Sequence, residues 1–204
     1  MCASSISFPM SSEISWSTHL CVDDSVEYRA DAPALMCDYD TWAVDASGAP
    51  ALSGQSRIDV VVSSQRRPLA AWLVEVKDYR RLTQNASRPK QAVGVAQKLG
   101  RIGDSLANKL GDSLDFIASA ECPPSLSKAV NTARHKCFVF HCIMPELTPA
   151  LSPMVPTGFP ANQFIAFRHS PAAQRVDSSI LRRDDTINAD PALPWSVSLL
   201  PVGP

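Results

Sequence analysis

The sequence contains no apolar run of about 20 residues and no pair of cysteines in a Cys-x-x-Cys arrangement. Without such a run, no segment is expected to span a membrane. The six cysteines are scattered, and we expect them to be reduced thiols. The first ten residues lack the basic start and the long apolar stretch of a signal peptide. The sequence therefore predicts a cytoplasmic protein with no membrane partner.

The overall composition is typical of a globular protein, with 45% hydrophobic and 19% charged residues. A length of 204 residues is enough for one domain with a substantial core, and no internal repeat is visible. Most of the prolines lie after residue 120. We therefore expect a single domain over residues 1–204, with a core at about 36–144 and a proline-rich C-terminal extension at 145–204.

The net charge of −1 conceals an uneven distribution of charge along the chain. Residues 1–56 hold one basic and eight acidic residues, a net charge of −7. Residues 57–136 hold fourteen basic and seven acidic residues, a net charge of +7. A polyanion such as DNA would gain affinity from the basic segment by releasing counterions. The alternative is that these lysines and arginines form an ordinary solvated surface.

Two apolar, β-branched runs surround a short polar segment between Arg57 and Arg80, which predicts two neighbouring strands joined by a tight connection. Each run contains charge that a buried strand normally avoids: Asp59 in the first, Glu75 and Lys77 in the second. Residues two apart on a strand share a face, so Glu75 and Lys77 lie together. If Asp59 comes alongside, two carboxylates and an ammonium converge, which predicts a metal site beside a catalytic lysine.

This order, an Asp followed after fifteen residues by Glu-Val-Lys, resembles the motif of the PD-(D/E)xK nuclease superfamily; the resemblance covers residues 40–110. The proline that usually precedes the Asp is absent. The resemblance implies a restriction-endonuclease-like α/β fold, in which helices flank a central mixed sheet. It also implies that Asp59 and Glu75 hold Mg²⁺ together with the carbonyl of Val76, and that Mn²⁺ can replace this ion. Lys77 would then position or activate the attacking water.

The same resemblance points to two further residues. Members of the fold often place a glutamate before the first core strand, aimed at the metal. Glu13 and Glu27 are the glutamates available, and Glu27 is favoured. Many members also carry a glutamine near the start of the following helix, directed at the metal-bound water or the phosphate, and Gln91 suits that role. A subgroup has a tyrosine four residues later, where this chain has Val95. An exposed surface position is the alternative for each.

Four basic residues are expected to contact the phosphates of a nucleic acid. Arg80 and Arg81 follow the second charged strand directly, and an arginine there can clamp a phosphate with two parallel hydrogen bonds. Lys98 and Lys109 lie on one side of a helix predicted over residues 87–115. For the arginines, the alternative is an ordinary charged strand end.

Hydrophobic patterning predicts the remaining elements. A strand over Met36–Val44 precedes the two charged strands, and the three form a meander. A fourth strand follows the helix at 136–144. In the helix, Gly103 falls on the apolar side and is expected to allow close approach to the sheet, while Gly100 or Gly111 is a candidate position for the helix to end or bend. In the extension we expect a proline-rich loop at 145–160, strands at 163–168 and 195–200, and a solvated turn at 182–185.

The leading hypothesis is a Mg²⁺-dependent nuclease that hydrolyses DNA phosphodiester bonds, acting in a defence or repair complex with a protein partner or as a homo-oligomer. Endonuclease and exonuclease action both stay open. One alternative is a catalytically inactive subunit that keeps the nuclease fold and binds nucleic acid or a protein partner. Another is an α/β protein whose strands carry these charges by chance. That alternative fails if the carboxylates of Asp59 and Glu75 lie close enough to share an ion.

Overall fold

The chain forms a mixed α/β structure, as expected, with a five-stranded mixed sheet, a three-stranded antiparallel sheet and helices. The computed structural model describes residues 13–22, 25–45, 55–64, 69–80, 89–144, 152–183 and 193–201. The strands are β1 (His19–Val22), β2 (Val26–Ala30), β3 (Ala34–Asp38), β4 (Val60–Ser64), β5 (Ala70–Asp78), β6 (His135–Ile143), β7 (Ser178–Arg183) and β8 (Trp195–Leu199). The helices are α1 (Tyr39–Asp45), α3 (Pro89–Gly100), α4 (Ile102–Ala118), α5 (Pro124–Asn131) and α6 (Ala161–Arg168), with short 3-10 turns η2 (Ser152–Met154) and η3 (Ala173–Arg175).

The larger sheet has the strand order β3-β4-β5-β6-β7. Strands β3, β4 and β5 pair antiparallel, so the predicted three-stranded meander is confirmed. The chain then crosses over through the helices and returns as β6, which pairs parallel to β5 as the fourth strand of the sheet. Strand β7 adds a second parallel pair. The C-terminal extension therefore completes this sheet through β7, while β8 joins β2 in the smaller sheet.

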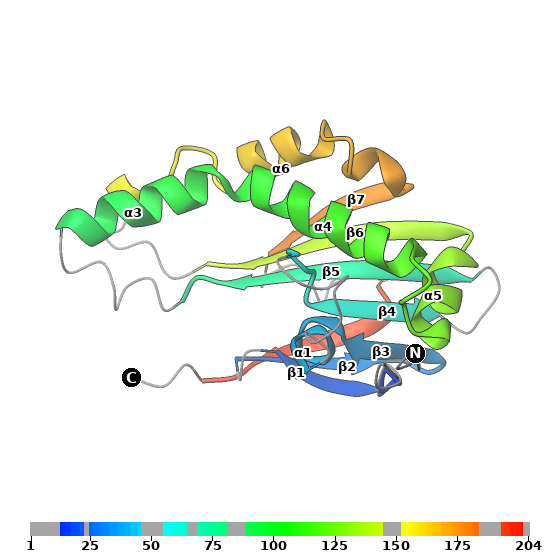
Figure 1. The fold of residues 1–204 in the computed structure, drawn as a ribbon. Coiled ribbons are helices and arrows are strands. Elements are labelled where there is room, and N and C mark those ends of the chain that lie inside the picture. Colours follow the sequence, from blue (N-terminus) through cyan, green and yellow to red (C-terminus); the bar gives the residue numbers. More distant parts are fainter. Residues whose placement is uncertain are drawn as a thin grey trace, which may run out of the picture.

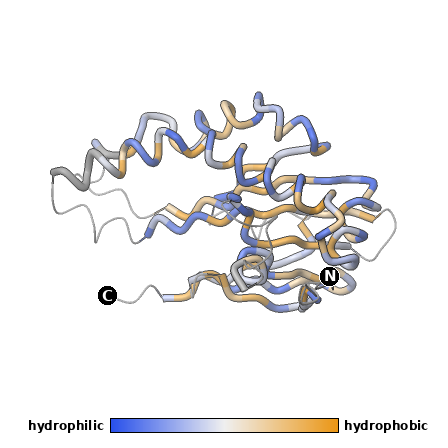
Figure 2. Tube along the Cα trace, in the orientation of Figure 1, coloured by the Kyte–Doolittle hydropathy of each residue, from blue (hydrophilic) through white to orange (hydrophobic). Residues whose placement is uncertain are grey.

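The elements stack in three layers (Figure 1). Helices α3, α4 and α6 cover one face of the larger sheet, and the smaller sheet lies on the other face. Alternation along β5 sends Leu73 into the core beneath the helices and Val74 into the core between the sheets. Figure 2 shows that hydrophobic residues follow the strands of the stack, whereas the helices also carry hydrophilic stretches. Both faces of the central strands are therefore buried.

A buried polar pair links the two sheets. The Tyr28 hydroxyl on β2 lies 2.5 Å from Nδ1 of His141 on β6, and both residues are fully buried. Burial lowers the pKa of His141 to about 4, so its ring is neutral at physiological pH. The two inward-facing polar groups, one from each sheet, thus hydrogen-bond to each other within an otherwise apolar interface.

The strand predicted over Met36–Val44 is correct only for its first three residues. Strand β3 ends at Asp38, and helix α1 begins at Tyr39. The Asp38 carboxylate accepts a hydrogen bond of 2.9 Å from the N–H of Thr41, which is the contact of a helix N-cap. Within α1, Tyr39 and Trp42 are buried three residues apart, as one face of a helix requires. The apolar alternation in the sequence was therefore compatible with two structures.

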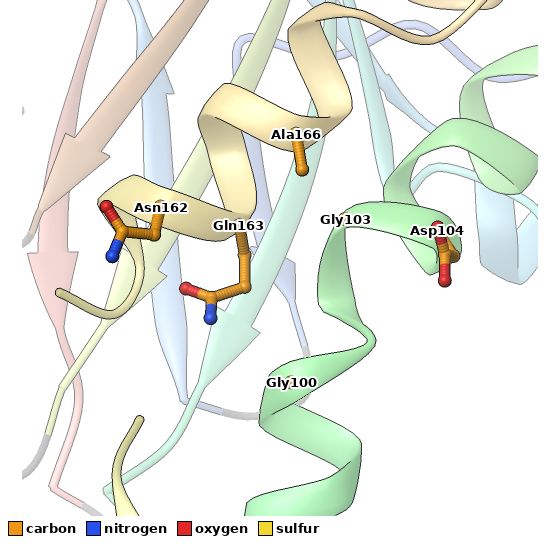
Figure 3. Close-up of a pocket in the computed structure, with 6 residues that line it drawn as sticks. All are labelled: Gly100, Gly103, Asp104, Asn162, Gln163 and Ala166. Atoms are coloured by element: carbon orange, nitrogen blue, oxygen red, sulfur yellow. The ribbon is translucent and has the colours of Figure 1, made fainter. Parts of the chain in front are cut away.

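The helix predicted over 87–115 is two helices, because the chain breaks at Arg101 between α3 and α4. Of the two glycines suggested by the sequence, Gly100 is the last residue of α3, whereas Gly111 lies within α4. Gly103 packs against α6 instead of the sheet (Figure 3). A Cβ at this glycine would lie 2.7 Å from the backbone oxygen of Gln163, so only glycine allows the two helices to approach so closely.

The prediction of a strand at 163–168 is wrong, because this segment lies in helix α6. Phe164 and Phe167, three residues apart, point into the core together. Arg182 and Arg183 belong to β7, so they do not form the predicted turn, and residues 184–185 lie outside the described part of the chain. The strand predicted at 195–200 is confirmed as β8. No helix among the described residues is long and apolar enough to cross a membrane.

Candidate active site

The pairing of β4 with β5 fixes the backbone of Asp59. Asp59 directly precedes β4, and its N–H donates a hydrogen bond of 3.1 Å to the carbonyl of Val74. Its own carbonyl accepts hydrogen bonds from Tyr39 and Asp40 at the start of α1, at 2.9 and 3.2 Å. The turn from β3 into α1, which the sequence did not predict, therefore holds Asp59 at the end of the sheet.

The side chains of the three motif residues converge on the helix-covered face of the sheet. Oδ2 of Asp59 accepts a 2.6 Å hydrogen bond from the N–H of Val76, the residue between Glu75 and Lys77. Nζ of Lys77 lies 2.5 Å from Oε1 of Glu75. The prediction that Glu75 and Lys77 share a face is thus confirmed, and Asp59 does come alongside them.

A second ammonium enters the site from helix α4. Nζ of Lys109 lies 2.8 Å from Oε1 of Glu75 and 3.5 Å from Oδ1 of Asp59. It also donates a hydrogen bond of 3.0 Å to Oε2 of Glu75. One cation therefore contacts both carboxylates, which argues against charges placed by chance. The sequence suggested phosphate binding for Lys109. Helical spacing predicts on which side of the helix Lys109 lies, but it does not predict which strand ends that side faces.

Helix α4 is anchored to the segment that leads into Asp59. The Ser113 hydroxyl accepts a hydrogen bond of 3.1 Å from the N–H of Ile58, and the Asp112 carboxylate accepts one of 2.8 Å from Ser56. Both residues lie one turn after Lys109 on the helix. The backbone of Lys109 is consequently held in a fixed position relative to Asp59.

Burial sets the protonation of the two carboxylates. Glu75 is fully buried, which together with the Asp59 carboxylate raises its pKa to about 7, even though Lys77 and Lys109 act in the opposite direction. Burial likewise raises the pKa of Asp59, against the effect of both lysines. Burial alone would lower the pKa of Lys77, but Glu75 and Asp59 outweigh it and raise that pKa above its ordinary value. Lys77 therefore stays charged, while Glu75 titrates near neutrality.

The donor atoms suit a hard divalent cation. Oε1 of Glu75 is buried and receives no well-directed hydrogen bond from any described residue, although both ammonium groups lie within ion-pair distance of it. Such an oxygen keeps lone pairs available for a metal. Among the described residues, no cluster brings three His, Cys, Asp or Glu side chains together. Two carboxylates with several waters match the way in which proteins hold Mg²⁺.

Glu27, the favoured upstream ligand, lies elsewhere in the fold. It sits on β2 next to the inward-facing Tyr28, so its side chain points out from the smaller sheet. There it contacts Nε2 of His19 at 2.5 Å and Nη2 of Arg29 at 3.3 Å, and these partners lower its pKa. Glu27 is thus separate from the carboxylate pair, and Glu13 is an exposed residue ahead of β1.

Arg80 has a structural role that the sequence did not indicate. Its guanidinium pairs with Asp78 at 2.7 Å and donates to the backbone carbonyls of Ser25 and Leu200, both at 2.9 Å. These carbonyls adjoin β2 and β8, so the side chain ties the end of β5 to the smaller sheet. The expected role in phosphate binding would compete with these contacts.

The other predicted nucleic-acid and catalytic residues are placed only in part. Lys98 is exposed on α3. Gln91 lies in the first turns of the same helix, and its side chain is outside the described part of the structure, as is the whole of Arg81.

Comparisons of the chain with family models, with curated proteins and with solved structures find no match. A functional assignment therefore depends on the geometry of Asp59, Glu75, Lys77 and Lys109.

Proposed function

We propose that this protein is a metal-dependent nuclease of the PD-(D/E)xK type, with a restriction-endonuclease-like fold, that hydrolyses DNA. The observation that carries the proposal is the convergence of the Asp59 and Glu75 carboxylates with the Lys77 ammonium at one buried point. The arrangement of the sheet supports it, because an antiparallel meander followed by helices and a parallel strand gives the central mixed sheet that the motif implies.

Each residue of the site has a chemical task in this proposal. Asp59 and Glu75 would hold Mg²⁺ or Mn²⁺, with the carbonyl of Val76 as a further oxygen ligand. The ion, when bound, would polarise the scissile phosphate and lower the pKa of a bound water. Lys77 would orient that water or stabilise the negative charge that develops on the phosphate. The partly buried setting of Lys77, with 29% of its side chain exposed, strengthens this interaction by limiting screening.

DNA is the proposed substrate because the basic segment of the chain contains the site. Residues 57–136 carry the net charge of +7, and helix α3 presents Lys98 to solvent within this segment. Such a surface attracts a phosphate backbone without reading its sequence. The proposed cellular setting is a defence or repair complex, with a protein partner or a second copy of the chain supplying target selection.

A cleavage assay tests the proposal. Purified protein is incubated with supercoiled plasmid, linear duplex and single-stranded DNA in the presence of Mg²⁺, Mn²⁺ or EDTA. We expect cleavage of at least one substrate with either ion and none in EDTA. Asp59→Asn is the matched control, because it keeps the side-chain shape and removes the charge. Cleavage that persists in EDTA, or equally in Asp59→Asn, would contradict the assignment.

A catalytically inactive subunit is the second candidate, and one observation favours it. Lys77 and Lys109 together already balance the two carboxylates, and among the described residues no further acidic ligand joins them. In this case the charged cluster would stabilise the fold, and the protein would bind DNA or a partner without turnover. DNA binding with no cleavage under any metal condition, unaffected by Asp59→Asn, would support this candidate over the nuclease.

A further inference from the structure

The cluster of four charges is balanced without a metal ion. Asp59 and Glu75 contribute two negative charges, and Lys77 and Lys109 contribute two positive charges. The two lysines are not equivalent. Lys77 contacts Glu75 from the same strand, whereas Lys109 bridges Glu75 and Asp59 from a different element. A bridging position between two carboxylates is also where a shared divalent cation would lie.

We propose that Lys109 is the resident counter-ion of this site and that a divalent cation displaces its ammonium group. This inference rests on the proposed metal-dependent function. In the metal-free protein the Lys109 ammonium contacts both buried carboxylates and favours their charged forms. When the ion binds, the lysine side chain moves away from them, and the polypeptide around the site keeps its position.

Electrostatic repulsion makes simultaneous occupation unfavourable. Nζ of Lys109 lies 2.8 Å from Oε1 of Glu75 and 3.5 Å from Oδ1 of Asp59, the same oxygens that would coordinate the ion. A cation on those oxygens would face the ammonium at contact distance in a site of low dielectric. Without Lys109, the site carries a charge of −1. Mg²⁺ brings it to +1, and a single bridging phosphodiester then neutralises it.

The structure allows the side chain to move while the helix stays fixed. Helix α4 is anchored by the hydrogen bonds from Ile58 to Ser113 and from Ser56 to Asp112, so the Lys109 backbone has little freedom. Its side chain is a flexible four-carbon stem, and 19% of it is exposed to solvent. The side chain therefore already borders on water.

The first test measures Mg²⁺ binding without DNA by calorimetry at about pH 8.5 and again at about pH 9.5, because the pKa of Glu75 is about 7 in the wild type and the loss of Lys109, which lowers it, raises it further. The wild type is compared with Lys109→Met, with Lys109→Arg, which keeps the positive charge, and with Lys128→Met as an exposed control on α5. We expect Lys109→Met to bind Mg²⁺ at least about tenfold more tightly, and the other two variants to resemble the wild type. Equal affinity in the wild type and Lys109→Met would overturn the inference but leave the metal site standing. No binding in either protein would overturn the metal site as well.

The second test uses the unmodified wild type, so it does not depend on a variant that folds. Lysines are acetylated briefly with and without Mg²⁺, and modification at each position is quantified by mass spectrometry. We expect Mg²⁺ to increase acetylation of Lys109 several-fold and to leave the exposed Lys98 unchanged. If Mg²⁺ binds but acetylation of Lys109 stays constant or falls, the ammonium is not displaced and the inference is wrong.

Discussion

The N–H of Val76 donates a hydrogen bond of 2.6 Å to Oδ2 of Asp59. The middle residue of the Glu-Val-Lys segment thereby locks the aspartate that the motif places on the preceding strand. Through this contact the backbone of one strand orients the carboxylate of the other. The two carboxylates and the lysine are consequently positioned by the sheet itself and not by a flexible loop.

Because of this contact, two substitutions that both remove the Asp59 charge are expected to differ in stability. Asp59→Ala leaves the buried N–H of Val76 without an acceptor, whereas the amide oxygen of Asp59→Asn can replace the carboxylate oxygen. We expect both variants to lose cleavage, and Asp59→Ala to be less stable than Asp59→Asn by about 1–3 kcal/mol. Urea denaturation at neutral pH measures the difference. Equal stability of the two variants would show that the hydrogen bond does not contribute to the free energy of unfolding.

The raised pKa of Glu75 predicts how stability depends on pH. The folded protein holds this proton up to a pKa of about 7, whereas the unfolded chain loses it near the ordinary value of 4.5. Between these values the native state binds more protons, so the stabilisation that Glu75 contributes falls as the pH rises. It is fully present below 4.5 and lost above 7.

The measurement compares the wild type with Glu75→Gln, which cannot ionise. We expect the free energy of unfolding of the wild type, relative to Glu75→Gln, to fall by roughly 2–3 kcal/mol as the pH is raised from about 4.5 to about 8. Asp59 and His141 are present in both proteins, so their titrations largely cancel. Parallel stability curves would mean that the pKa of Glu75 is not raised.

Arg80 is predicted to act through stability and not through DNA affinity. Replacing it with methionine removes the bonds to Ser25 and Leu200 and takes the ion-pair partner from the carboxylate of Asp78, whose side chain is only 9% exposed. We expect Arg80→Met to lower stability by about 2 kcal/mol or more. Thermal unfolding checks this, and an unchanged melting temperature would return Arg80 to the set of candidate phosphate contacts.

Lys98 on helix α3 is predicted to act through DNA affinity and not through stability. It is exposed, so Lys98→Met is expected to change stability by less than about 0.5 kcal/mol. If it contacts a phosphate, the same change should reduce the slope of log affinity against log salt by about one unit. DNA binding measured across a salt series gives this slope. A slope equal to that of the wild type would place the DNA path elsewhere on the protein.

The motif residues could be predicted because their arrangement depends on local periodicity. Residues two apart on a strand share one face, so the prediction that Glu75 and Lys77 lie together required no tertiary information. Asp59 required only that the two strands pair, which their composition indicated. Lys109 is different, because its place in the site depends on how α4 crosses the sheet. The only signal available was its position on the polar side of a helix.

The errors in the fold share a physical cause. Short apolar segments fit a strand and one face of a helix equally well, and tertiary contacts decide between them. At 163–168 two phenylalanines three residues apart pack against phenylalanines of β6, which selects a helix. At Tyr39 the cap formed by Asp38 ends the strand. Glu27 was favoured by sequence order alone, whereas the alternation of β2 turns it outward.

The most direct test of the account is the cleavage rate of Lys77→Met under single-turnover conditions, measured beside its Mg²⁺ and DNA affinities. Methionine keeps most of the side-chain length and removes the ammonium that lies 2.5 Å from Glu75. We predict that both affinities stay near those of the wild type and that cleavage slows at least ~100-fold, the typical effect of losing one electrostatic stabiliser. Cleavage by Lys77→Met at the full wild-type rate would contradict the proposed mechanism.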